Sequence, residues 1–180
     1  AHHPTSKLLC LENTHNLCFG APIGINYFDE VRTIVDRYNL KLHIDGARIF
    51  NAAVALNTTV KNLAKTADTI TCCLSKGLSS PVGSLIMGNE ELIYKGRRIR
   101  KSLGGGMRQS GILAAAGIYS FENMISRLEE DHENAKLLAK ELSQINEIKI
   151  NLNTIHTNII FFNLQNTSIA DEKLISQLLN

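Results

Sequence analysis

The chain has 180 residues, of which 44% are hydrophobic and 20% charged, and its formal net charge is +2. These values are typical of a globular protein with one good core and room for part of a second domain. So small a net charge gives no reason to expect nucleic acid or an anionic membrane as a partner. No apolar run approaches the roughly 18 residues that span a bilayer, and the basic run 95–101 is interpreted as a solvated helix face.

The cysteines and the chain ends carry further information. The four cysteines show no CxxC spacing, and Cys72 and Cys73 are adjacent in an apolar run; the other two are Cys10 and Cys18. We therefore expect buried thiols in a reducing compartment, the cytoplasm, rather than a disulfide framework or a zinc site. The chain opens without Met and stops within an expected helix, so we expect a fragment of a longer protein.

Strands and helices alternate through the first part of the chain. The apolar patterns predict a strand over 7–11, an amphipathic helix over 26–39, a strand over 40–45, helices over 47–57 and 60–67, and a strand over 69–74. This alternation implies right-handed crossovers and a mainly parallel sheet covered by helices on both faces. The predicted fold class is therefore α/β.

The second part of the chain changes character. A strand is predicted over 82–88, and a helix over 90–103 ends at the glycines 104–106. An alanine-rich helical region, as one helix or two, runs over 110–145, followed by strands over 148–152 and 158–164 and a final helix from 171. We place a domain boundary near residue 123. Residues 1–122 are then part of a large domain, and 123–180 are connecting helices and an incomplete smaller domain.

Two predicted strands lead into ionisable residues. The strand over 40–45 ends at Asp45, and Lys76 follows the strand over 69–74. Because ligands of parallel α/β sheets bind at the carboxyl ends of the strands, both side chains are candidates for one crevice. The alternative interpretations are a turn residue or helix cap for Asp45 and a solvated loop lysine for Lys76.

One chemistry requires such a pair. A partly desolvated amine attacks a carbonyl to form a Schiff base, and pyridoxal phosphate is held in that way while a carboxylate pairs with its pyridine nitrogen. Lys76 and Asp45 fit these two roles. Arg48, near the start of the next helix, is a candidate for binding a carboxylate. Arg108 and the backbone amides beside glycines 104–106 form a candidate anion site, although a simple helix break also explains the glycines.

Four segments carry a family pattern in their order along the chain. They are LENTHN, LHIDGARIFNA, CLSKGLSSPVGSLIMG and LGGGMRQSGILAAAG. Together they resemble the low-specificity L-threonine aldolases, over roughly residues 1 to 145. The resemblance implies the fold-type I architecture of pyridoxal-phosphate enzymes, with a mainly parallel sheet covered by helices and the start of a smaller α+β C-terminal domain. It also implies a homodimer or homotetramer.

The resemblance implies roles for individual residues. Lys76 matches the lysine that bonds the cofactor covalently, and Asp45 matches the carboxylate that pairs with the pyridine nitrogen. Arg48 matches a binder of the substrate carboxylate. Arg108 matches an arginine that reaches the cofactor phosphate of a neighbouring subunit.

The histidines differ in what the resemblance implies for them. His2 matches a histidine near the substrate hydroxyl and is the candidate catalytic base, with His3 as the alternative alignment. Glu12 and His15 belong to a loop motif of the active site without a specified role. His43 lies inside a predicted strand and is interpreted as a histidine with satisfied hydrogen bonds.

The implied activity is retro-aldol cleavage of L-threonine or L-allo-threonine to glycine and acetaldehyde. One alternative is another fold-type I activity, an aminotransferase or a β-lyase, since Asp45 and Lys76 alone do not select the reaction. The other is a truncated chain that only folds or associates. The family's phosphate loop, ring-stacking histidine and second carboxylate-binding arginine have no counterpart here, so we expect weak or absent activity from the 180 residues alone. No metal site is expected.

Overall fold

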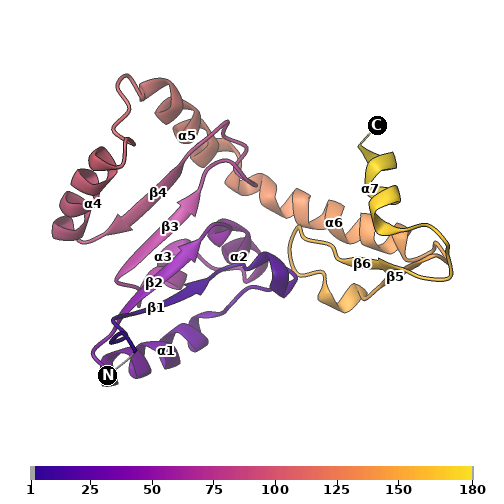
Figure 1. The fold of residues 1–180 in the computed structure, drawn as a ribbon, viewed down its shortest axis with the longest axis horizontal. Helices are drawn as coiled ribbons and strands as arrows, with labels where there is room; N and C mark the ends of the chain where they lie inside the picture. Colours follow the sequence, from indigo (N-terminus) through magenta and orange to yellow (C-terminus); the bar gives the residue numbers. More distant parts are fainter. Residues whose placement is uncertain (1–2, 180) are drawn as a thin grey trace.

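Four strands form the main sheet of the computed structural model, which describes residues 3–179 (Figure 1). They are β1 (Leu8–Glu12), β2 (Lys41–Gly46), β3 (Thr69–Cys73) and β4 (Ser84–Gly88), in the spatial order β1-β2-β3-β4. The first three strands are parallel, and β4 is antiparallel to β3. A parallel partner would need a long crossover, but β3 and β4 are joined by a short loop without a helix. The prediction of a mainly parallel α/β sheet is confirmed.

Three helices pack on one face of this sheet: α1 (Ile25–Arg37), α2 (Ile49–Ala55) and α3 (Val60–Ala64). Side chains alternate along β2, so that Leu42 and Ile44 are fully buried while Lys41 and Asp45 are exposed. The main core lies between the sheet and these helices, and its buried members are Phe28, Ile44, Ile49, Ala52, Ala53, Leu63, Ile70 and Cys72.

The other face of the sheet differs from the prediction that helices cover both faces. Among residues 3–179, only α4 (Glu90–Ser102) lies against this face, beside the edge strand β4, and the central strands are open. The physical reason is the polar side chains of β2 on this face, because strands buried on both faces are apolar throughout. The expectation of buried thiols is partly wrong: Cys72 is buried, but Cys10 on the open face of β1 and Cys18 in the turn after β1 are exposed.

The long helical region is two helices. The first is α5 (Gly111–Asn123) and the second is α6 (Leu128–Leu142), with the 3-10 turn η2 (Ile125–Arg127) between them. No residue of α4 is buried, and in α5 only Gly117 and Ser120 are. The domain boundary near residue 123 stays a prediction, at a position where the structure has a break between helices.

A small antiparallel pair follows α6. Its strands, β5 (Ile148–Ile150) and β6 (Phe162–Leu164), are shorter than predicted because a 3-10 turn, η3 (Leu152–Thr154), and extended loop fill the interval. The last helix is α7 (Asp171–Leu178). Every helix in residues 3–179 is too short or too polar to cross a membrane.

The segment after β1 joins the two sheets. It contains the 3-10 turn η1 (Asn16–Cys18). The hydroxyl of the buried Thr157 donates to the carbonyl oxygen of Gly20 over 3.0 Å, and the rings of Phe19 and Phe161 meet edge to face at 5.2 Å. These contacts hold the loop that follows Glu12 against the chain between β5 and β6.

Candidate active site

A row of side chains crosses the open face of the main sheet near the carboxyl ends of its parallel strands. Glu12 of β1 is the register partner of Asp45 of β2, which in turn is the partner of Thr71 of β3. Asp45 is exposed, and the other two are half-buried. Sequence patterns predicted Asp45 for this position but did not predict Glu12 and Thr71 as its neighbours. The register between strands depends on how they pair, and no single segment determines it.

The carboxylate of Asp45 has one occupied and one free oxygen. Its Oδ1 accepts hydrogen bonds from the Ala47 amide over 3.0 Å and from the Thr71 hydroxyl over 3.4 Å. Its Oδ2 has no hydrogen-bond partner within residues 3–179. The bond to Ala47 is the contact that a turn residue makes, and so agrees with the alternative interpretation of Asp45 as a turn residue. The same bond also fixes the carboxylate, so that Oδ2 can accept a hydrogen bond from a ligand.

Lys76 lies in the loop that leaves β3. This loop is held at its base by backbone hydrogen bonds of 2.9 Å between Leu74 and Gly83 and between Ser80 and Leu74, and by a tight turn from Lys76 to Ser79. The amine of Lys76 is exposed and forms no ion pair within residues 3–179. The partial desolvation considered for this amine is therefore not provided by this part of the protein.

Lys76 opens into a cavity of about 430 Å³ that is shared with α6 and the loop before β6. Arg127, Asp131 and Asn134 line it from the helical side, and Asn158 lines it from the loop. The side-chain oxygen of Asn158 is buried without a hydrogen-bond partner in the described part of the chain. Asp45 and Arg48 are not among the residues that line this cavity, so the structure brings Asp45 and Lys76 to neighbouring strand ends without enclosing them together.

Arg48 is the N-cap residue of α2, three residues after Asp45. Its side chain is half-buried and has no ion-pair partner in residues 3–179. A guanidinium without an ion-pair partner in this part of the chain has its charge available for a carboxylate ligand.

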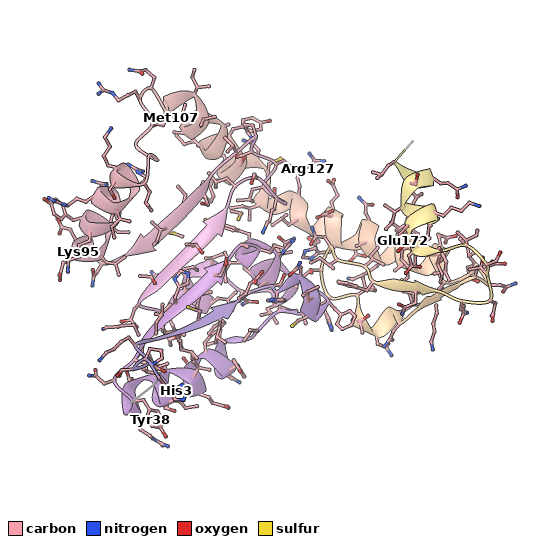
Figure 2. All side chains as sticks on the ribbon, in the orientation of Figure 1. His3, Tyr38, Lys95, Met107, Arg127 and Glu172 are labelled. Carbon is pink, nitrogen blue, oxygen red and sulfur yellow. The ribbon has the colours of Figure 1, made fainter. Side chains whose placement is uncertain are left out.

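Arg108 does not join this group. It is exposed in the connection between α4 and α5, where Figure 2 labels the neighbouring Met107, and this connection projects away from the main sheet. Of the two flanking helices, α4 follows the edge strand β4, and α5 leads back from the connection toward the loop after β3. His2 lies outside the described residues. The proposed roles of Arg108 and His2 therefore stay predictions.

Two other histidines have defined partners. His15 Nε2 is 3.5 Å from Glu12 Oε2, and its Nδ1 accepts the Leu17 amide over 3.1 Å. His43 Nδ1 is 2.8 Å from the hydroxyl of Thr69, as expected for a histidine with satisfied hydrogen bonds. Within residues 3–179, no cluster of three or more metal-binding side chains is present.

Most of the chain matches one family of known proteins. Residues 1–165 match the family described as beta-eliminating lyase. The chain belongs to the beta-eliminating lyase family. Within this family, it is 47% identical over 163 residues to the probable low-specificity L-threonine aldolase 2 of Arabidopsis thaliana, which covers 91% of the chain and 46% of the relative. It is 51% identical over 143 residues to the low specificity L-threonine aldolase of Escherichia coli K12, covering 79% of the chain and 42% of the relative.

Solved structures share the fold. A putative L-allo-threonine aldolase of Listeria monocytogenes has a TM-score of 0.78 at 19% identity, over 88% of this chain and 44% of that protein. A PLP-dependent aminotransferase of Streptococcus suis has a TM-score of 0.70 at 16% identity, over 98% of this chain and 47% of that protein. The predicted fold class is thus confirmed for this lyase-family chain. The chain spans about half the length of the relatives that it matches.

Proposed function

We propose that the whole protein is a pyridoxal-phosphate-dependent aldolase that cleaves L-threonine and L-allo-threonine to glycine and acetaldehyde. The observation that carries the proposal is the arrangement at the ends of β2 and β3. There, Asp45 presents a free carboxylate oxygen, and Lys76 presents an amine without an ion pair in residues 3–179. The names of the relatives in Arabidopsis thaliana and Escherichia coli, low-specificity L-threonine aldolases, support the choice of reaction.

The residues present fit the chemistry of pyridoxal phosphate. A primary amine such as that of Lys76 is the nucleophile that bonds its aldehyde. The free Oδ2 of Asp45 is an acceptor suited to a protonated pyridine nitrogen, since an ionised carboxylate strengthens such a bond. When bound, the cofactor supplies the sink for the electron pair that bond cleavage leaves on the substrate.

The chain's own residues would orient the substrate and move its protons. Arg48, with no ion-pair partner in the described chain, binds the substrate carboxylate and so fixes the direction of the bond between Cα and Cβ. A base must take the β-hydroxyl proton as that bond breaks. His2, or a water that it positions, is our candidate for this base.

The proposal includes an assembly and a location. Arg108 stands on an exposed connection away from the row of Asp45, which suits a role toward the cofactor phosphate of a neighbouring subunit in a homodimer or homotetramer. All four cysteines are free, which suits the reducing cytoplasm.

Product analysis tests the reaction. The whole protein is incubated with pyridoxal phosphate and L-threonine, and glycine and acetaldehyde are measured. We expect the two products in equal amounts, and no need for an added amino-group acceptor. Formation of a 2-oxo acid, or a requirement for such an acceptor, would contradict aldol cleavage.

The second candidate is a β-lyase, favoured by the description of the matched family as beta-eliminating lyases. Both reactions use the same amine and carboxylate, and they differ in the substrate bond that breaks. A substrate with a good leaving group at Cβ, such as β-chloroalanine, separates them. Pyruvate formation from it that is faster than threonine cleavage would favour the β-lyase.

A further inference from the structure

A buried pair of polar side chains joins α2 to α6. The side-chain nitrogen of Asn51 lies 3.1 Å from Nε2 of His132, although the residues are 81 positions apart. Asn51 is 3% exposed and His132 is 4% exposed. The two helices pack directly against each other in the molecule (Figure 1).

The pair fixes the protonation of the imidazole. An amide nitrogen can only donate, so Nε2 of His132 accepts and the ring proton lies on Nδ1. Burial lowers the pKa of His132, and Lys136 acts in the same direction, while the nearby Asp131, Glu133 and Glu129 oppose it. The neutral ring is therefore the state that this geometry holds.

Asn51, the α2 member of the pair, lies close to the loop of Lys76, as does Leu128 of α6. A Cβ atom placed on Gly77 would lie 3.3 Å from Oδ1 of Asn51 and 2.8 Å from Cδ2 of Leu128. Leu128 is 2% exposed and precedes His132 by one turn of α6. The backbone at Gly77, beside Lys76, is thus close to Asn51 of α2 and to Leu128 of α6, with no room for a side chain between them.

The same helix lines the space into which Lys76 opens. Asp131 and Asn134, which flank His132 on α6, line the cavity together with Lys76 and Gly77. A shift of α6 relative to α2 would therefore move the cavity wall and the support of the lysine loop together.

We propose that Asn51 and His132 are positioning residues that set the place of the Lys76 amine by locking α6 against α2 behind Gly77. The consequence for catalysis rests on the proposed function of Lys76, whereas the positional effect does not. Misplacing a catalytic group by about 1 Å can cost about 100-fold in rate. Loss of the pair would therefore slow the reaction, although neither residue touches the substrate.

The test compares three variants of the whole protein. His132→Leu removes the acceptor, and His132→Gln keeps a side-chain acceptor for Asn51. Ala139→Gly is the matched control, because Ala139 is fully buried on the same helix but does not contact Gly77. Asn51→Ala breaks the same hydrogen bond from the α2 side and replaces His132→Leu if that variant does not fold.

The first measurement needs no cofactor. The native protein is acetylated briefly, and the modification of Lys76 is compared by mass spectrometry with that of the exposed Lys95 on α4. We expect His132→Leu to change this ratio by about threefold or more, as altered surroundings do to amine reactivity. His132→Gln should restore the ratio of the unaltered protein. Ala139→Gly should lower the melting temperature but leave this ratio unchanged. An unchanged ratio in His132→Leu overturns the inference.

The second measurement uses pyridoxal phosphate. We expect the pH midpoint of the visible absorption of the loaded protein to shift by about 0.5 unit or more in His132→Leu and to return in His132→Gln. Equal shifts in His132→Leu and Ala139→Gly would mean a merely structural role and would overturn the inference. If the unaltered protein shows no such absorption, the proposed function fails, and the acetylation ratio still decides the positional inference.

Discussion

Asp45 and Thr71 are register partners on adjacent parallel strands, and the Thr71 hydroxyl donates to Oδ1 of Asp45 over 3.4 Å. Together with the Ala47 amide, this bond occupies Oδ1 and leaves Oδ2 without a hydrogen-bond partner in residues 3–179. The proposed function of Asp45 therefore depends on its charge more than on the hydroxyl of Thr71.

Asp45→Asn should keep the contact to Ala47 but present an uncharged amide to the ligand. We expect the kcat/KM for threonine cleavage by the whole protein to fall by about 100-fold or more, the size of effect seen when one electrostatic partner of a reacting system is lost. Thr71→Val keeps the charge and should cost about tenfold or less, since the bond it removes is long. An Asp45→Asn protein as active as the unaltered one would contradict the role of the carboxylate.

Two glycines should respond in opposite ways to alanine. A Cβ on Gly46 would overlap the carbonyl oxygen of Thr71 and lie 3.0 Å from Cβ of Ile49, so backbone would have to move. We expect Gly46→Ala to lower the free energy of unfolding by about 2 kcal/mol or more. A Cβ on Gly96, inside α4, would have no atom within 4 Å. Gly96→Ala should therefore raise the free energy of unfolding by about 0.5 to 1 kcal/mol. Urea unfolding of the 180-residue chain measures both. If the two substitutions changed the free energy of unfolding equally, β2 and β3 would be less closely packed at Gly46 than the distances above indicate.

Asp68 should make the fold sensitive to acid. Its carboxylate accepts from the Leu42 amide over 2.8 Å, from Arg32 over 2.9 Å and from Lys41 over 3.1 Å. Burial raises the pKa of this group, but these bonds outweigh it and lower the pKa from 3.8 to about 2. Because the folded pKa lies below the unfolded one, the stabilisation is present above the unfolded pKa and is lost as the pH falls toward 2.

Asp68→Asn should therefore lower the free energy of unfolding at pH 7 by about 1 to 2 kcal/mol, allowing for solvent at a partly exposed group. The difference from the unaltered chain should shrink between pH 4 and pH 2, roughly the interval between the two pKa values. Asp29→Asn is the control, since its ion pair with Lys65 is exposed and worth less than about 1 kcal/mol. A loss in Asp68→Asn that is independent of pH would contradict the assignment.

The elements of the main sheet could be predicted because each depends on a local pattern. Leu42 and Ile44 alternate with polar residues, and the buried face of β2 follows from that period. The same alternation places Cys10 on the open face. The polar side chains of β2 on that face are the sign, missed in the prediction, that helices of the described chain do not cover it.

The sequence predicted the residues of the candidate site that stand at the end of a strand. It did not predict the contacts between residues that are distant in the sequence. Asp45 and Lys76 stand at strand ends that the patterns locate. The position of Thr71 beside Asp45 depends on the register between β2 and β3, and Asn51 and His132 are 81 positions apart in the sequence. Such pairings are decided by tertiary packing, which no single segment encodes.

The proposed function depends most on a bond between the amine of Lys76 and the aldehyde of pyridoxal phosphate. The most direct measurement is to incubate the whole protein with this cofactor, reduce it with borohydride and map the modified peptides by mass spectrometry. We expect a phosphopyridoxyl group on Lys76, its loss in Lys76→Ala, and little modification of the exposed Lys95. Modification of other lysines with Lys76 unmodified would contradict the proposed bond.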